Sequence, residues 1–294
     1  MSPEVIVVGT DGSADADRAV EWAAEQAAAE HRPLVVLSAT SQSPTPAAVG
    51  PTAAYAIPPE DLLARARSTA ERGALLAGRH VPGVTVETRA VVGSAITELT
   101  RLTSVVHLVV LGSRGRGPAR SKVLGSVSAS VARHAACPVV ICRPPRPDHV
   151  THGILVGADG TEESLPVIEF AFRQASLRGQ RLTVLRSVER AVATVRVAGG
   201  GGDPDLEAQR LLVGESVAGF GERFPDVRVR PFLVSDPPDE ALATLAEEHE
   251  LVVVGRHPAE SLGRMVRSTT ATAVLEHAHT NVAVVPEDRS PDGA

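Results

Sequence analysis

The sequence has 294 residues, of which 43% are hydrophobic and only 2% aromatic, and its formal net charge is −6. This length suffices for two globular domains, the low aromatic content predicts a core of alanine, valine and leucine, and the negative charge argues against general nucleic-acid binding. No run of eighteen apolar residues is present, and the N-terminus lacks the basic segment and cleavage site of a signal peptide, so we expect a cytoplasmic protein without a membrane span.

Short apolar runs alternate with amphipathic segments through the first half of the chain. Val5 to Gly9 is a continuous apolar run, which is typical of a strand buried on both faces. A turn is expected next, after which Ser13 or Asp15 would cap a helix. Further strands are expected at 34–40, 84–92, 107–111 and 139–142, helices at 61–78 and from 95 onwards, and a long loop at 41–59. This alternation predicts a parallel sheet covered on both faces.

A glycine-rich, basic segment follows the fourth of these strands. The apolar run ends at Gly112, and a helix-like run begins at Gly125 and Ser126 and continues to Ala136. Glycines let backbone N–H groups approach a ligand closely, and the start of a helix attracts anions through its dipole. Positive charge would come from Arg114, Arg116, Arg120 and Lys122. The segment therefore predicts an anion site, and the alternative is a basic surface loop without a ligand.

The second half of the chain repeats the first. Residues 153–160 match residues 5–12 at an offset of 148, whereas residues 251–255 match residues 108–112 at an offset of 143. Such a repeat indicates duplication of one α/β domain. We predict a first domain at 1–143, a linker at 144–150, a second domain at 151–286 and a tail at 287–294.

The loops after the first and fourth strands are expected to lie close together. Open parallel sheets bind ligands beyond the carboxyl ends of their strands, at the point where the strand order reverses. In the commonest doubly wound order, that point lies between the first and fourth strands. Asp11 follows the first strand and Gly115 follows the fourth, so this order would place them together.

The spacing of Gly112, Gly115 and Gly125–Ser126 resembles the nucleotide-binding motif of the universal stress protein family. It is neither a P-loop nor a dinucleotide fingerprint, and the resemblance extends over nearly the whole chain. It implies two tandem doubly wound parallel-sheet domains of five strands each, of the adenine nucleotide alpha hydrolase-like type. It also implies ATP as the ligand, and Mg²⁺ is expected to accompany the phosphates.

The resemblance also implies roles for individual residues. Asp11 would lie beside the nucleotide, although an aspartate in a turn before a helix also has a purely capping explanation. The backbone of Ala39 or Thr40 would bond the adenine, and Lys122 would reach the phosphates. The residues expected to contact the nucleotide are Gly9, Asp11, Ala39, Thr40, Gly112, Ser113, Arg114, Gly115, Arg116, Lys122, Gly125, Ser126 and Val127.

The pattern favours an ATP-binding regulator of the stress response over a dedicated catalyst. Phosphoryl transfer needs a positioned nucleophile, a base and acidic metal ligands, and Asp11 is the one acid near the motif. No histidine or cysteine set has the spacing of a metal site, so no catalytic or metal-ligating residue is assigned. The alternatives are a slow ATPase or nucleotidyl-transferring enzyme on the same fold, and a protein-interaction scaffold that binds no nucleotide.

The two halves are not expected to be equivalent. Asp159 and Gly255 keep the starts of the two loops, but the residues that correspond to Gly115, Lys122, Gly125 and Ser126 are Pro258, Met265, Ser268 and Thr269. Proline lacks an N–H donor, and the methionine removes a charge. We expect the second half to bind nucleotide weakly or not at all. The alternative is a site adapted to another ligand, because Arg256, Arg264 and Arg267 remain.

Each half ends in a short apolar strand, at 139–142 and 282–285. An exposed apolar edge strand is a template for pairing with another strand, and members of the resembled family often pair these last strands. We therefore expect a homodimer. The alternative is a monomer in which the two halves pair with each other.

Overall fold

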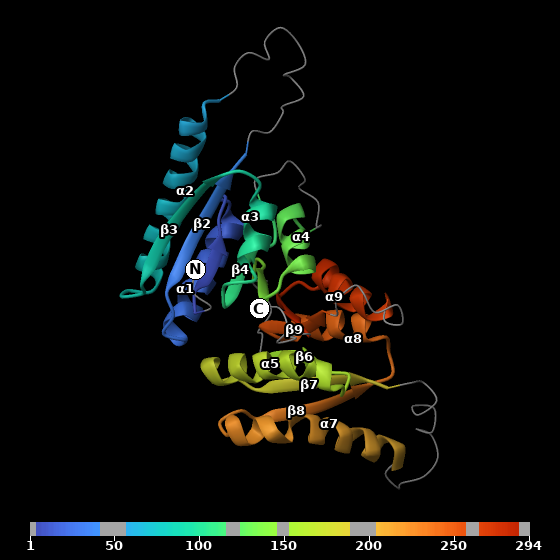
Figure 1. Ribbon diagram of the computed structural model, residues 1–294. Coiled ribbons are helices and arrows are strands. Elements are labelled where there is room, and N and C mark those ends of the chain that lie inside the picture. The colour runs from blue at the N-terminus through green and yellow to red at the C-terminus, as the bar shows by residue number, and fades with distance from the viewer. Residues whose placement is uncertain are drawn as a thin grey trace. The chain divides into compact units, whose positions relative to one another are not determined.

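The computed structural model describes residues 4–41, 57–115, 124–145, 153–188, 204–256 and 265–287 (Figure 1). The chain divides into two compact units, Met1–Arg143 and Pro144–Ala294. Each unit is an α/β domain, and in each the described strands form a five-stranded parallel part of a sheet.

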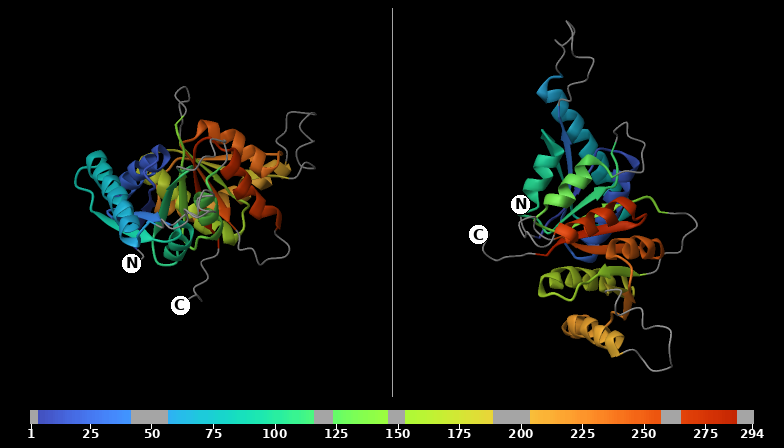
Figure 2. Two further views of the ribbon diagram at one scale, coloured as in Figure 1. Left: turned by 90° about the horizontal axis from the view of Figure 1, so that it is seen from above. Right: turned by 90° about the vertical axis from the view of Figure 1, so that its right-hand side faces the viewer.

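The first domain has the strand order β3-β2-β1-β4-β5. Its elements are β1 (Ile6–Gly9), α1 (Ala14–Ala29), β2 (Leu34–Thr40), α2 (Pro59–His80), β3 (Val86–Val92), α3 (Ala95–Leu102), β4 (Leu108–Gly112), α4 (Ser126–His134) and β5 (Val139–Cys142). Helix α1 packs against α2, and α3 against α4 (Figures 1 and 2). The expected doubly wound order is therefore correct, and the strand order reverses between β1 and β4.

The second domain repeats this order as β8-β7-β6-β9-β10. Its elements are β6 (Ile154–Gly157), the 3₁₀ helix η2 (Glu162–Ser164), α5 (Leu165–Arg178), β7 (Leu182–Ser187), α7 (Pro204–Arg223), β8 (Val229–Val234), α8 (Pro238–Leu245), the 3₁₀ helix η3 (Ala246–Glu248), β9 (Leu251–Arg256), α9 (Met265–His277) and β10 (Asn281–Pro286). The sequence repeat therefore corresponds to two domains with the same strand order.

Small and branched apolar side chains form the core of each domain. In β1, Ile6, Val7 and Val8 are fully buried, as expected for a strand covered on both faces. Helix α1 contributes Ala19 and Ala23 to the first core, and the small side chains of such alanines let a helix pack closely on a sheet. The second core contains Phe172, whose ring stacks on Phe220 and lies tilted against Phe224.

Several expected boundaries move by a few residues. Helix α2 begins at Pro59 instead of residue 61, because proline suits the first turn of a helix, where its missing N–H costs nothing. Strand β3 begins at Val86 instead of residue 84, β4 extends to Gly112, and α4 ends at His134 instead of residue 136. Most of the loop predicted at 41–59 lies outside the described residues.

None of the helices in the described ranges is long and apolar enough to cross a lipid bilayer. Both cysteines, Cys137 and Cys142, are buried, and neither is in a disulfide bond.

Candidate functional site

The carboxyl ends of β1 and β4 lie side by side in the first domain, with Gly9 paired in register with Leu111. The loops that follow these strands therefore meet, as the sequence predicts. The Ser13 hydroxyl donates to the carbonyl oxygen of Arg114 at 3.3 Å. A Cβ atom added to Gly115 would lie 2.6 Å from Oδ2 of Asp11, so the second loop approaches this carboxylate closely.

Asp11 serves the local turn and also faces the second loop. Its Oδ1 accepts a hydrogen bond from the backbone N–H of Ser13 at 2.9 Å, which fixes the turn before α1. Ser13 then caps α1 by accepting from the N–H of Ala16. The other oxygen, Oδ2, lies on the side of Gly115. The capping and the ligand interpretations of Asp11 are therefore compatible, because each uses a different oxygen.

Two of the glycines expected to contact the nucleotide lie very close to other parts of the chain. A Cβ atom on Gly112 would lie 2.5 Å from the backbone carbon of Asp15, so β4 and the start of α1 are in direct contact. A Cβ atom on Gly9 would lie 2.6 Å from Cδ2 of Leu111. The backbone contact accounts for Gly112 without a ligand, whereas Gly9 meets only the ends of leucine side chains.

Asp15 is the centre of a polar network that the sequence analysis missed. It is buried in the first turn of α1, and its Oδ2 accepts from the Ser113 hydroxyl at 2.7 Å and from Nε of Arg114 at 3.2 Å. Its Oδ1 pairs with Arg18. From the sequence alone, Asp15 is predicted only as a helix cap, since no local pattern connects it to residues nearly a hundred positions later. Asp15 therefore positions two of the predicted site residues.

Arg143 is a second residue that the sequence analysis did not assign to the site. It follows β5, and its neighbour Cys142 pairs in register with Gly112. Burial lowers the pKa of Arg143, and so does the positive charge of Arg114, whereas Asp15 raises it. The buried carboxylate of Asp15 is thus surrounded by Arg18, Arg114 and Arg143. The excess positive charge at this edge of the sheet favours an anion.

Helix α4 presents its N-terminus to the same edge. Gly125 is the N-cap and has no side chain that could accept from the first N–H groups of the helix, which belong to Ser126 and Val127. The Gly125 N–H donates to the Ser113 carbonyl at 2.8 Å, and the Ser128 hydroxyl donates to the Gly112 carbonyl at 2.7 Å. These bonds tie the start of α4 to the end of β4, in the arrangement by which helix N-termini bind phosphate.

The end of β2 distinguishes between the two residues proposed for the base. Residues of a parallel strand direct their N–H and C=O groups alternately to the two neighbouring strands. The Thr40 carbonyl accepts from Gly93 beyond β3, whereas the Leu37 carbonyl accepts from Thr10 beyond β1. Ala39 therefore faces the β1 side, beyond the end of that strand. Its backbone is directed to the open edge above β1, and Thr40 is directed away from it.

Arg116 and Lys122, which were also predicted to contact the ligand, lie outside the described residues, as does Arg120. Within the described ranges, no group of three or more histidine, cysteine or carboxylate side chains could hold a metal ion.

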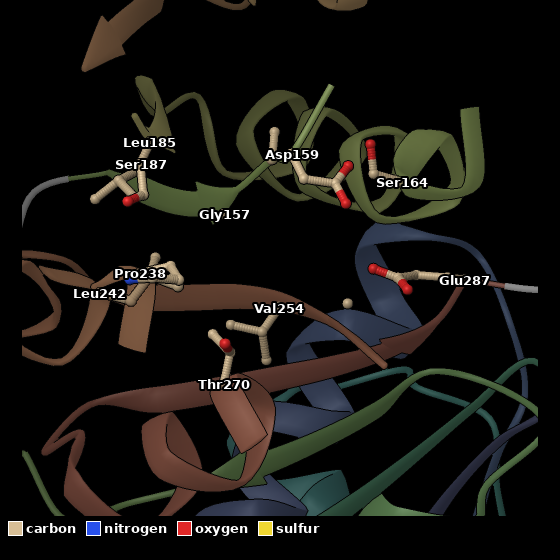
Figure 3. Close-up of a pocket in the computed structure, with 12 residues that line it drawn as sticks. Gly157, Asp159, Ser164, Leu185, Ser187, Pro238, Leu242, Val254, Thr270 and Glu287 are labelled. Carbon is tan, nitrogen blue, oxygen red and sulfur yellow. The ribbon is translucent and has the colours of Figure 1, made fainter. Parts of the chain in front are cut away.

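The second domain has a cavity of about 270 Å³ at the corresponding edge of its sheet (Figure 3). It is lined by the ends of β6, β7 and β9 together with α8, α9 and Glu287. Asp159 keeps the turn role of Asp11, because its Oδ1 accepts from the N–H of Thr161 at 2.9 Å. Glu287, which the sequence analysis assigned to the tail, stands over Gly255: a Cβ atom there would lie 2.6 Å from the Glu287 carboxyl carbon.

Comparison with known proteins identifies a family for both domains. A model described as "Universal stress protein family" matches residues 3–143 and 151–286. A universal stress protein of Mycobacterium tuberculosis strain H37Rv is 32% identical over 291 residues, covering 95% of this chain and 96% of its own length. A universal stress protein of Mycolicibacterium smegmatis is 31% identical over 285 residues, with coverage of 95% and 96%.

Solved structures give the same fold. The crystal structure of a universal stress protein from Archaeoglobus fulgidus superposes with a TM-score of 0.69 at 18% identity, covering 98% of this chain and 100% of that chain. A functionally unknown protein from Pseudomonas aeruginosa PAO1 superposes with a TM-score of 0.62 at 16% identity, with coverage of 96% and 92%.

Proposed function

The chain belongs to the universal stress protein family, and we propose that its first domain binds ATP and that binding regulates its contacts with protein partners in the stress response. The observation that carries the proposal is the convergence of Asp11, Gly115 and the N-terminus of α4 at the point where the strand order reverses. The arginines around Asp15 add the positive charge that a polyphosphate requires.

The described residues suit the separate parts of a nucleotide. The N–H groups at the start of α4 and the half-exposed guanidinium of Arg114 suit the phosphates. The backbone of Ala39 suits the edge of the adenine, and Asp11 suits a hydroxyl group of the ribose. Gly115 permits the close approach of the backbone that a side chain would prevent.

A Mg²⁺ ion bound with the nucleotide would take most of its ligands from phosphate and water, as Mg²⁺ commonly does. Asp11 is the carboxylate that the described loops offer to it, because both oxygens of Asp15 already bind the chain's own side chains. A phosphoryl-transfer enzyme needs further acidic groups and a base. We therefore propose binding without a dedicated catalytic cycle, and slow hydrolysis or nucleotidyl transfer at this site is the second candidate.

The test is Gly115→Asp, which places a second carboxylate beside Asp11 where the nucleotide phosphates are proposed to approach. We expect ATP affinity, measured by isothermal titration calorimetry, to fall at least tenfold. Gly78→Asp is the matched control, because Gly78 is exposed on α2 with open space around it, and we expect its affinity to be unchanged. Equal affinity of the Gly115→Asp variant and the unmodified protein would refute the site.

The alternatives are separated by two further measurements on the same proteins. Release of phosphate or AMP well above the level of an Asp11→Ala variant would favour the enzyme. Failure of the unmodified protein to bind ATP, or to carry a nucleotide through purification, would favour the scaffold.

A further inference from the structure

We propose that the cavity of the second domain binds an uncharged nucleoside and excludes its phosphorylated forms, because the carboxylate of Glu287 lines this cavity and would repel phosphate groups. The choice of a nucleoside rests on the proposed function of the first domain, whereas the exclusion of phosphate rests on the second domain alone.

The base-binding side of the site is retained in the second domain. The Leu185 carbonyl accepts from Ala158 beyond β6, and the N–H of Val188 donates to the carbonyl of Val234, the last residue of β8. Ser187 therefore faces the β6 side, beyond the end of that strand, as Ala39 does beyond β1. Ser187 also lines the cavity. Its backbone is thus placed to bond the edge of a planar base.

The floor of the cavity suits a flat apolar ring. The cavity is lined there by Leu185, Leu242, Val254 and Pro238, and the first three of these side chains are buried. Figure 3 shows these side chains around the same space as Ser187. At about 270 Å³, the cavity lies at the lower limit of pockets that take small organic ligands, roughly 300–1,000 Å³. It therefore favours a compact ligand.

A carboxylate lies at the end of β9 in the second domain. Gly255 corresponds to Gly112, and the Glu287 side chain lies against it so closely that a Cβ atom there would collide with the carboxylate. The N–H of Glu287 donates to the Arg256 carbonyl at 3.2 Å, which fixes the start of this side chain at the end of β9. Burial lowers the pKa of Arg256, and the negative charge of Glu287 raises it. The positive charge of Arg256 is therefore already balanced by the carboxylate of Glu287.

Among the residues that the structure describes, the charges around the cavity balance one another. Asp159 and Glu287 are the carboxylates that line it, and Figure 3 shows both directed towards the cavity. Arg256 lies beside Glu287, and the guanidinium of Arg186 reaches Gly160, next to Asp159. A near-neutral cavity with carboxylate acceptors favours a neutral ligand that donates hydrogen bonds from hydroxyl and amino groups. A triphosphate would bring several negative charges towards Glu287 and Asp159.

The experiment uses the full-length protein, with adenosine and ATP as probes and amide hydrogen exchange as the readout. We expect adenosine to slow exchange at the ends of β6 and β7 and in the first turn of α8, while ATP leaves these segments unchanged. This readout locates the ligand in the second domain whatever happens in the first. Adenosine without effect on these segments at millimolar concentration, or ATP that protects them equally, would overturn the proposal.

Glu287→Gln tests the excluding group. It keeps the size of the side chain and removes its charge, so we expect the affinity of the second domain for ATP, measured from the same exchange data, to rise at least tenfold, with adenosine affinity changed less than threefold. Glu222→Gln on the exposed surface of α7 is the matched control. Unchanged exclusion of ATP in the Glu287→Gln variant would overturn the role of Glu287. Gly115→Asp without loss of ATP binding would contradict only the first-domain site.

Discussion

Gly112 and Gly115 belong to one motif, yet their surroundings differ. The space beside Gly112 is filled by the backbone of α1, which is held by its own helix, whereas the space beside Gly115 is filled by the end of a side chain, the Asp11 carboxylate. An added methyl group lowers the stability of the fold strongly where its neighbour is rigid, because the neighbour cannot move away, and only weakly where the neighbour can move. We therefore expect Gly112 to be needed for folding and Gly115 for the proposed site.

Alanine substitutions at these two positions should have different effects. We expect Gly112→Ala to lower the free energy of unfolding by about 3 kcal/mol, because β4 and α1 must separate. Gly115→Ala should change it by less than about 1 kcal/mol while weakening ATP binding, because it displaces Asp11. Urea denaturation and ATP titration of both variants provide the measurements. A Gly112→Ala variant as stable as the unmodified protein would show that the contact with α1 is loose.

Asp15 shows how a buried carboxylate can organise a site without touching a ligand. We expect Asp15→Asn to lower the free energy of unfolding by about 2 kcal/mol, since it leaves Arg114 and Arg18 without their shared anion. Asp17→Asn is the control: Asp17 lies in the same first turn of α1, so both variants remove one favourable charge from the helix N-terminus. Thermal denaturation of the pair isolates the network, and equal losses in the two variants would indicate a dipole effect alone.

At the scale of elements, an ion cluster joins the end of α1 to the start of β4. Burial by itself would raise the pKa of Glu30, but its hydrogen bond with His107, the charge of His107, and hydrogen bonds from Gln26 and Arg32 outweigh burial and lower the pKa from 4.5 to about 2. A lowered carboxyl pKa stabilises the fold above the unfolded-state pKa and loses this contribution as the pH falls towards the folded-state value. The relevant interval is therefore between about pH 4.5 and 2.

Glu30→Gln should remove this pH dependence. We expect it to cost roughly 3 kcal/mol at most at pH 6, with the difference from the unmodified protein shrinking as the pH falls below 4.5. Glu25→Gln is the control on the same helix, because Glu25 pairs with His80 at an exposed position and such pairs contribute little. Denaturant titrations at several pH values give the comparison. A pH-independent loss in Glu30→Gln would mean that only packing is affected.

The elements themselves were largely predictable from the sequence, because strands buried on both faces appear as continuous apolar runs and the repeat fixes their number. The contacts between elements were not. Asp15 meets Ser113 only because β1 and β4 are neighbours in a definite register. The commonest strand order predicts that they are neighbours, but nothing in the sequence gives the register. Arg143 and Glu287 follow the last strands of their domains, where proline and polar residues suggest a linker and a tail, yet each lies against a site.

At the scale of the whole molecule, our prediction of the oligomeric state depends on the last strand of each domain. Taken within its own domain, β5 lies beside β4 and β10 beside β9 at the end of the strand order, and apolar strands at such ends favour pairing. We expect a homodimer, so light scattering at micromolar concentration should give about twice the chain mass of 30.6 kDa. A monomer mass over a tenfold range of concentration would contradict this and favour pairing of the two domains within one chain.

The number of nucleotides per chain follows from the inequivalence of the two domains. In the first, arginines and the start of α4 surround the proposed phosphate position, whereas in the second the Glu287 carboxylate lies over Gly255 and lines the cavity. Replacing favourable contacts by an unfavourable charge costs several times 1.4 kcal/mol, the energy of a tenfold change in affinity. We expect equilibrium dialysis to give one ATP per chain, with any second site at least a hundredfold weaker. Two sites of equal affinity would contradict both the weak second site expected from the sequence and the role proposed for Glu287.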